Sequence, residues 1–307
     1  MVDSIRHIAR QLAESEDPHE RYKILLNVYE RPAESREIAI LRDDIAASPL
    51  VSTLLAERRS EGIALAPHAR WRGAHWVLHV LADLGSAAGD SRLLPLRDQV
   101  YQWLHDEARC EPCSGTVEGH ALHYLLFLGL ADQRTDVLAE RLVAWTQTWK
   151  PGKTPLSFAQ GLAALRGLYL HAQQRSSTAS ADAAIRLSED LLSCHLYKKP
   201  GSCTPLSADF TSLHYPCYEQ ADVLFAIKVM AEVGRAEDPR CRPAIDLLKS
   251  KQLADGTFPA ERKYYRPGRS DGEGDSLVNW GGTHKARGNT FVTLEALGAL
   301  HAAGERF

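Results

Sequence analysis

The sequence predicts an all-α protein in which about six helical hairpins close into a ring, an α/α toroid, as the single domain 1–307. Two observations lead to this prediction. Segments with one apolar and one charged face alternate with segments that are apolar on almost every side. The amphipathic segments also recur at separations of 39 to 56 residues, which is typical of a repeat made of two helices.

Three short amphipathic helices are expected first, and they would complete the ring. Their ranges are 3–14, 19–29 and 35–47. Pro32 follows the second helix and Pro49 follows the third. Because proline lacks the backbone N–H that a helix interior needs, each proline predicts a helix end nearby.

Outer and inner helices are expected to alternate along the rest of the chain. The amphipathic segments, expected on the outside, are 50–62, 92–108, 136–149, 182–193 and 243–256. The almost wholly apolar segments, expected on the inside, are 74–85, 120–131, 157–170, 221–234 and 290–304. A helix that is apolar on every side is surrounded by other helices. An open stack would leave a broad apolar face in water, so closure into a ring is favoured.

Composition excludes several kinds of partner. The 36 lysines and arginines nearly balance the 39 acidic residues, and there is no long basic block, so no nucleic-acid partner is expected. The chain has neither a signal-peptide pattern nor an apolar run of about 18 residues, which predicts a cytoplasmic protein without a membrane span. Cys110 and Cys113 form half of a zinc site, but without a second pair two reduced thiols are the favoured interpretation. The oligomeric state stays open.

One repeat unit carries a resemblance to a known family. Its pattern is Leu248-x3-Gln252-x3-Gly256-x-Phe258. The pattern resembles the glutamine–tryptophan repeat of squalene–hopene and oxidosqualene cyclases, with phenylalanine at the aromatic position. Further stretches resemble divergent bacterial members of the wider terpenoid-cyclase and protein-prenyltransferase α/α-toroid superfamily. They are 70–85, 212–222, 238–265 and 278–304. The resemblance spans about residues 50–305 and implies a central apolar cavity with the site at one mouth.

Polar and aromatic residues gather at the N-terminal ends of the inner segments, which is the composition of a ligand pocket. The residues expected to bind substrate are Trp71, Arg72, His75, Trp76, Glu118, His120, Phe158, Cys217, Tyr218, Trp280, His284, Arg287 and Asn289. The tryptophans at 71 and 76 could instead be core residues, and the arginines could tie loops to carboxylates rather than bind an anion. The glycine-rich segment 266–288 is expected to be a long loop, either a lid or a mobile surface loop.

The stretch 214–222 is the candidate catalytic region. The candidate catalytic residues are Asp222, His214, Tyr215 and Glu219. Asp222 enters an apolar helix, where burial would raise its pKa unless the carboxylate is paired. A carboxylic acid with a raised pKa can protonate a substrate. The structural alternative is that Asp222 pairs with Arg72 or Arg287 and holds the ring together.

The resemblance implies an enzyme that uses acid–base residues to cyclise or rearrange a small apolar substrate of the isoprenoid or polyene type. The sequence lacks both the Asp-x-Asp-Asp motif of protonating cyclases and the magnesium-binding Asp-Asp-x-x-Asp motif, so Asp222 is the substitute acid and no metal or other cofactor is expected. Two alternatives stay open. One is a non-catalytic toroid that binds a lipid-like ligand or a protein partner. The other is a zinc-dependent prenyltransferase-like enzyme, for which His214 and Cys217 are residues of the right types.

Overall fold

The structure is a computed structural model that describes residues 2–56, 59–60, 63–105, 113–268 and 274–307. Over these residues it contains 13 α-helices and two pairs of two-residue strands, which confirms the predicted all-α class. Among the described helices, none combines the length and the apolar composition that a membrane crossing requires.

The three N-terminal helices lie where the sequence predicts them. They are α1 (Val2–Ala13), α2 (Pro18–Asn27) and α3 (Arg36–Ala47). The Asp17 side chain accepts a hydrogen bond from a backbone N–H in the first turn of α2, and Ser35 does the same for α3. These caps satisfy N–H groups that have no partner within the helix, so they fix where each helix begins.

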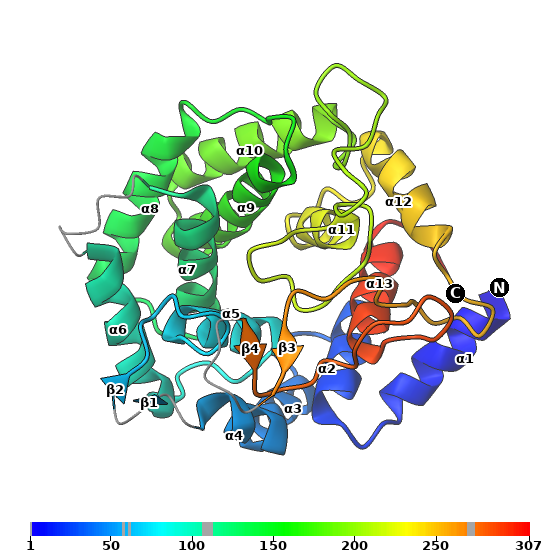
Figure 1. Cartoon of the computed structure of the whole chain (residues 1–307), viewed down its shortest axis with the longest axis horizontal. Helices are drawn as coiled ribbons and strands as arrows, with labels where there is room; N and C mark the ends of the chain where they lie inside the picture. The colour runs from blue at the N-terminus through cyan, green and yellow to red at the C-terminus, as the bar shows by residue number, and fades with distance from the viewer. Residues whose placement is uncertain (1, 57–58, 61–62, 106–112, 269–273) are drawn as a thin grey trace.

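The predicted alternation of amphipathic and apolar helices is present. The amphipathic helices are α4 (Pro49–Leu55), α6 (Leu94–His105), α8 (Gln133–Thr146), α10 (Thr178–Ser193) and α12 (Arg242–Lys249). Short 3-10 turns at Ser91–Leu93 and Pro239–Cys241 precede α6 and α12. The apolar helices are α5 (Ala74–Leu84), α7 (Gly115–Phe127), α9 (Pro155–Arg175), α11 (Val223–Glu232) and α13 (Thr290–Ala302). Figure 1 shows α6, α8, α10 and α12 toward the outside and the apolar helices nearer the middle.

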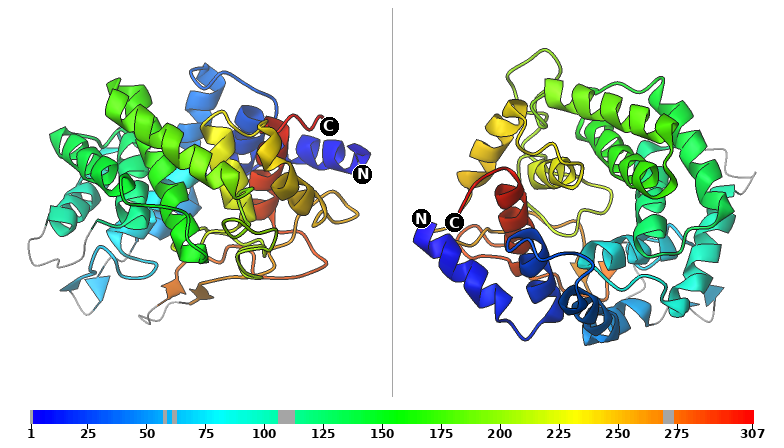
Figure 2. Two further views of the ribbon diagram at one scale, coloured as in Figure 1. Left: turned by 90° about the horizontal axis from the view of Figure 1, so that it is seen from above. Right: turned by 180° about the vertical axis from the view of Figure 1, so that it is seen from behind.

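The apolar helices contact one another in chain order. Helix α5 packs on α7, α7 on α9, α9 on α11, and α11 on α13, which in turn packs on α2. The Nδ1 atom of His19 in α2 donates a hydrogen bond to the carbonyl oxygen of Leu84 at the end of α5, at 2.9 Å. Helix α2 therefore lies between α13 and α5, and Figure 2 shows α2 and α13 side by side from behind.

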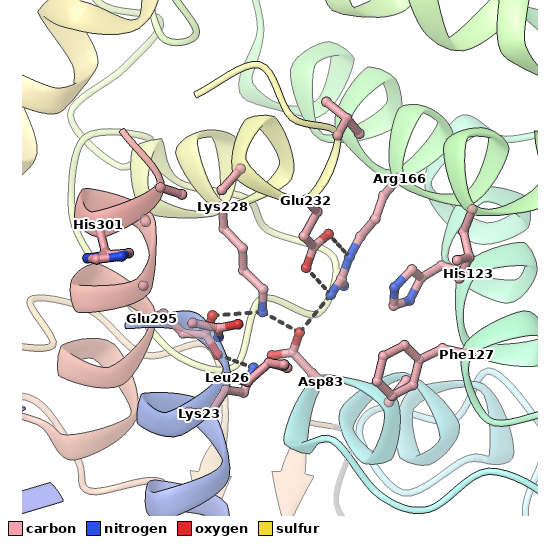
Figure 3. A pocket seen from close by; sticks show the side chains of 18 of the residues that line it. Lys23, Leu26, Asp83, His123, Phe127, Arg166, Lys228, Glu232, Glu295 and His301 are labelled. Atoms are coloured by element: carbon pink, nitrogen blue, oxygen red, sulfur yellow. Dashed lines mark hydrogen bonds and ion pairs between the residues drawn. The ribbon is translucent and has the colours of Figure 1, made fainter. Parts of the chain in front are cut away.

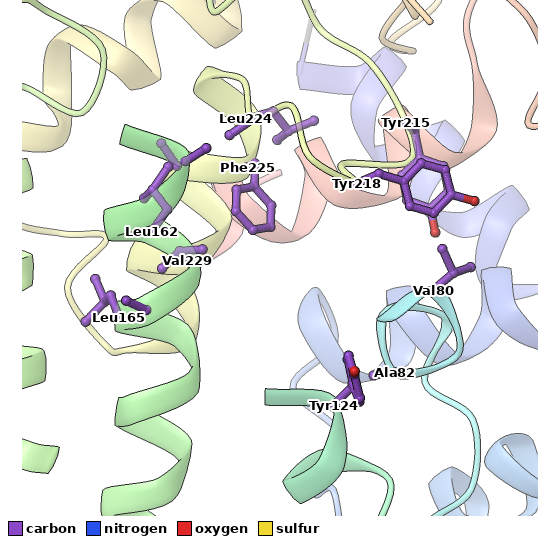
Figure 4. Close-up of a cluster of buried hydrophobic side chains, with 14 of the residues drawn as sticks. Val80, Ala82, Tyr124, Leu162, Leu165, Tyr215, Tyr218, Leu224, Phe225 and Val229 are labelled. Carbon is purple, nitrogen blue, oxygen red and sulfur yellow. The ribbon is translucent and has the colours of Figure 1, made fainter. Parts of the chain in front are cut away.

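The hydrophobic core lies between these helices. In Figure 4, Leu162 and Leu165 of α9 lie near Phe225 and Val229 of α11, while Tyr124 of α7 faces the end of α5. All of these side chains are buried. The large apolar area removed from water here is the main favourable term in folding.

Two glycines allow α7 and α9 to pack closely. A Cβ atom at Gly119 would lie 2.4 Å from the backbone of Ala163, and one at Gly167 would lie 2.6 Å from the carbonyl oxygen of Gly119. Such distances are shorter than any van der Waals contact, so a side chain at either position would force the helices apart.

Two of the amphipathic helices are shorter than predicted. Helix α4 ends at Leu55, and Arg59–Ser60 (β1) pairs antiparallel with Ile63–Ala64 (β2). Helix α12 ends at Lys249. No apolar side chain occurs between Ala56 and Ile63, so a longer α4 would have nothing to bury there.

The long loop predicted at 266–288 contains a short parallel strand pair. Arg266–Pro267 (β3) pairs with Asp275–Ser276 (β4). The backbone N–H of Trp71 donates to the carbonyl oxygen of Asp275, and its indole N–H donates to the carbonyl oxygen of Tyr264. These bonds hold the segment against the N-terminal end of α5.

Candidate functional site

The N-terminal ends of the apolar helices, where the sequence places a pocket, are packed with aromatic side chains. The rings of Trp71 and Tyr218 stack at 4.3 Å with an angle of 7°, and Trp76 lies edge-on to both. A cavity of about 10 Å³ borders Trp71, and another of about 10 Å³ borders His214, Tyr215 and Cys217. Both tryptophans belong to the main hydrophobic core cluster, so the structure gives them the alternative role of core residues.

The other predicted binding residues divide into buried and exposed sets. The buried ones are Arg72, His75, Glu118, His120, Phe158, Trp280 and Asn289. Asn289 caps α13 and donates a hydrogen bond to the carbonyl oxygen of Trp280 at 2.7 Å. Glu118 accepts from the backbone N–H of Ser114 at 2.8 Å. His284 and Arg287 are exposed, so they do not lie among the buried residues of the predicted site.

The Asp222 carboxylate is the N-terminal cap of α11. One oxygen accepts from the backbone N–H of Phe225 and the other from the backbone N–H of His214, each at 2.8 Å. The His214 ring nitrogen Nδ1 lies 3.1 Å from the second oxygen. Asp222 therefore pairs with His214, where the sequence suggested Arg72 or Arg287.

The remaining candidate catalytic residues, Tyr215 and Glu219, have structural partners. Tyr215 is buried with its ring stacked on Phe291 at 4.9 Å, while the Glu219 carboxylate lies 2.5 Å from the Arg70 guanidinium. Neither residue lines the large cavity described below.

His214, Cys217 and Asp222 bring three kinds of zinc ligand within 4.8 Å of one another. Burial alone would lower the pKa of His214, but Cys217 and the Asp222 carboxylate raise this pKa well above the ordinary value. Burial raises the pKa of the Cys217 thiol to about 11. A zinc ion at this place would have to displace the protons of His214 and Cys217 and compete with the two backbone N–H groups that already donate to Asp222.

Replacing Asp222 with alanine is expected to lower the free energy of unfolding by about 2–4 kcal/mol, because two buried N–H groups would lose their acceptor. Asp222→Asn keeps one acceptor oxygen and should cost less. Urea denaturation of both variants measures the difference. If Asp222→Ala were as stable as the unchanged protein, its role as a cap would be contradicted.

A cavity of about 410 Å³ lies toward the C-terminal ends of the apolar helices. All six helices α2, α5, α7, α9, α11 and α13 contribute to its wall. Its apolar lining includes Leu26, Phe127, Leu170, Ala231 and Ala299. Charged side chains from five of these helices line it, and Figure 3 shows that they meet inside it.

These side chains are joined by ion pairs, and we call them the charged network. Its members are Lys23, Asp83, Arg166, Lys228, Glu232 and Glu295. Lys228 lies between two carboxylates, 2.5 Å from Asp83 and 2.9 Å from Glu295. Figure 3 shows this bridge and three further ion pairs. Lys23 pairs with Glu295 at 2.7 Å. Arg166 pairs with Asp83 at 3.2 Å and with Glu232 at 2.5 Å.

The ion pairs of the charged network hold Lys228, Asp83 and Glu295 in their ionised forms. Burial alone would lower the pKa of Lys228, but Asp83 and Glu295 raise it above its ordinary value. Burial alone would raise the pKa of Asp83, but Lys228, Lys23 and Arg166 bring it well below its ordinary value. The pKa of Glu295 is lowered in the same way. Opposite charges at these distances in a buried site outweigh the cost of desolvation.

Two polar groups in the cavity wall keep unfilled hydrogen-bonding capacity. Among the described residues, neither Nη1 of Arg166 nor Nδ1 of His123 has a partner, although both side chains are about 95% buried, with 5% exposure each. Burial, helped by the charge of Arg166, lowers the pKa of His123 well below its ordinary value, so this imidazole is neutral. Each of the two atoms has less than 1 Å² of accessible surface, so a small movement of its side chain would have to open it to the cavity before a ligand could pair with it.

A second constellation lies in an outer cleft between α8, α9 and α10. His171 Nδ1 is 2.9 Å from the Ser180 hydroxyl, and Nε2 is 3.1 Å from the Asp136 carboxylate. These are the residue types of a serine hydrolase triad, but Ser180 is only 1% exposed and accepts a hydrogen bond from Ser177. A nucleophile must reach its substrate, so this group joins the three helices rather than forming a catalytic site.

The sequence did contain a signal for the charged network. Asp83, Arg166, Lys228 and Glu295 each stand within one of four nearly apolar segments. A charge in a helix that is surrounded by other helices needs a partner of opposite sign. Two acids and two bases in such positions could have indicated a buried network, although not its location.

Comparison of the chain with protein-family models, with curated proteins and with solved structures gave no match. The candidate site therefore rests on its own geometry. Of the cysteine pair noted in the sequence, Cys110 lies outside the residues that the structure describes.

Proposed function

We propose that the chain is a closed α/α toroid whose central cavity binds a small, largely apolar molecule. The successive contacts from α5 to α13 and on to α2 support closure, and so does the hydrogen bond from His19 back to Leu84. In this arrangement α2 is the sixth inner helix. That agrees with the expectation that the N-terminal helices complete the ring.

The observation that carries this proposal is the cavity itself. Its volume of about 410 Å³ falls within the range of roughly 300–1,000 Å³ that is typical of ligand pockets. Most of the surface that lines the cavity is apolar, although about half of the lining residues are charged or polar, and Arg166 and His123 have polar atoms without a partner. Lys228, Asp83 and Glu295 are held in their ionised forms, so they are suited to orienting a ligand rather than to exchanging protons with it.

Replacing Ala231 with phenylalanine is expected to weaken ligand binding at least about tenfold, because the larger side chain would occupy the cavity. Ala231 is half-buried and lines the cavity from α11, so the ring can enter it with little disturbance of the core. Titration with the neutral fluorescent probe N-phenyl-1-naphthylamine measures the affinity.

Ile185→Phe is the matched control, since Ile185 is 58% exposed on α10, away from the cavity. Equal binding by the unchanged protein and by both variants would place the probe elsewhere. Absence of binding by the unchanged protein would count against the proposed function.

A second candidate function is a cyclase-like enzyme that converts the bound molecule, as the sequence resemblance implies. One observation favours it: His123 is a neutral imidazole with an unfilled nitrogen in the wall of the cavity. A neutral imidazole can accept a proton from a reacting substrate. Native mass spectrometry of the purified protein, followed by incubation of the extracted molecule with fresh protein, separates conversion from binding alone.

A further inference from the structure

The charged network is balanced. Its three cations, Lys23, Arg166 and Lys228, face three carboxylates, Asp83, Glu232 and Glu295. Every member except Glu232 is at least about 90% buried, and Glu232 is partly exposed at the mouth. The further acid at the cavity, Glu30, is exposed and lies 3.0 Å from His301. The buried part of the cavity therefore has no spare charge of either sign.

A ligand that carried a full charge would upset this balance. An anion would add a fourth negative group beside cations that are already neutralised. In the buried part of the cavity a cation would find no carboxylate without a basic partner. The Glu30 carboxylate is exposed, and its partner His301 carries a charge only when protonated. A buried charge without its own counter-charge costs several kcal/mol.

The unfilled atoms fit a neutral polar group instead. Nη1 of Arg166 can donate a hydrogen bond to an oxygen. The neutral His123 ring can donate from one nitrogen and accept at the other. A hydroxyl group, a ketone carbonyl or an amide could satisfy these atoms without adding a charge.

On this basis we infer that the ligand of the cavity is a neutral molecule, with an apolar body and one oxygen-bearing head group held between Arg166 and His123. The inference rests on the proposed function. It names the class of ligand as an alcohol, a ketone or an amide, and it excludes carboxylates, diphosphates and amines of similar shape.

A matched set of probes tests the head group. Adamantan-1-ol, adamantane-1-carboxylate and adamantan-1-amine share one rigid apolar body, and at about pH 8 they are neutral, negative and positive respectively. Isothermal titration calorimetry with the full chain is expected to show the alcohol binding at least about tenfold more tightly than either ion. Equal binding of the three, or tightest binding of the carboxylate or the amine, would overturn the inference and leave the proposed function standing. Binding of none of the three would count against both.

Two variants reverse the expected preference. Asp83→Asn removes one negative charge, so its cavity should prefer the carboxylate. Lys228→Met removes one positive charge, so the cavity of this variant should prefer the amine. Binding of the amine should also raise the melting temperature of the variant. An unchanged preference for the alcohol in both folded variants would contradict the charge-balance argument. If either variant fails to fold, the comparison of the three probes on the unchanged protein still decides.

Discussion

Replacing Lys228 with methionine is expected to lower the free energy of unfolding by about 3–5 kcal/mol, the usual cost of removing one partner from a buried ion pair. Lys228 is 8% exposed and is the only described cation that contacts both Asp83 and Glu295 within 3 Å. Methionine keeps most of the side-chain volume, so the loss measures charge rather than packing. Urea denaturation followed by circular dichroism gives the value.

A double-mutant cycle measures how much of this loss of stability comes from the Lys228–Asp83 pair and how much from the rest of the charged network. Lys228→Met combined with Asp83→Leu restores the balance of charge, so the double variant should be more stable than the sum of the two single losses predicts. Arg31→Met is the surface control, because Arg31 and its partner Glu37 are both more than half exposed. It should change stability by no more than about 0.5 kcal/mol. A Lys228→Met loss as small as that of the control would contradict a buried network.

Lowering the pH from about 6.5 to about 4 is expected to destabilise the protein strongly. Burial lowers the pKa of His79 to about 4 and that of His19, with help from Lys23, to about 4. In this window the unfolded chain binds protons that the folded protein does not, so stability falls as the pH falls. Each histidine should contribute about 3 kcal/mol of this loss. Urea denaturation at a series of pH values measures it.

His79→Gln tests the contribution of one histidine. Glutamine does not titrate, and its amide can still donate to the carbonyl oxygen of Cys217, which His79 Nε2 contacts at 3.0 Å. The variant should lose less stability between pH 6.5 and 4 than the unchanged protein, by about 3 kcal/mol. His7→Gln, at an exposed position of α1, should leave the pH dependence unchanged. A His79→Gln profile that matches the unchanged protein would rule out a buried neutral His79.

His214 should act in the opposite direction above pH 6.5. Its folded-state pKa is raised well above the ordinary value, so the stability it provides is present at low pH and is lost as the pH rises through the raised pKa. The four buried histidines with lowered pKa, His19, His79, His120 and His123, dominate on the acid side.

The order and type of the helices could be predicted from the sequence because each helix has a local cause. The apolar periodicity located α5, α9 and α13, and α13 begins at the predicted residue, Thr290. Helix ends were less well predicted. The pattern of 50–62 is amphipathic, but α4 stops at Leu55, and the sequence from 57 to 62 has no apolar side chain with which a longer helix could pack.

The location of the candidate site could not be predicted in the same way. Polar residues at the N-terminal ends of the inner segments looked like a pocket, but Trp71, Trp76 and Tyr218 fill that space with their own rings. The cavity lies at the other end, where Arg166 and Lys228 reach across to carboxylates on different helices. Which charges meet depends on how each helix is rotated against its neighbours, and the spacing of residues along one helix does not determine that rotation.

The pairing of α2 with α13 has a consequence for how this protein is made. Glu30 and His301 lie 271 positions apart in the sequence and meet at 3.0 Å, and Lys23 and Glu295 meet close by. Contacts between such distant residues raise the contact order, which slows folding. A nascent chain can pack α5 against α7 soon after both leave the ribosome, but it cannot enclose the cavity before α13 has been synthesised. The proposed binding of a ligand should therefore be among the last properties that the chain acquires.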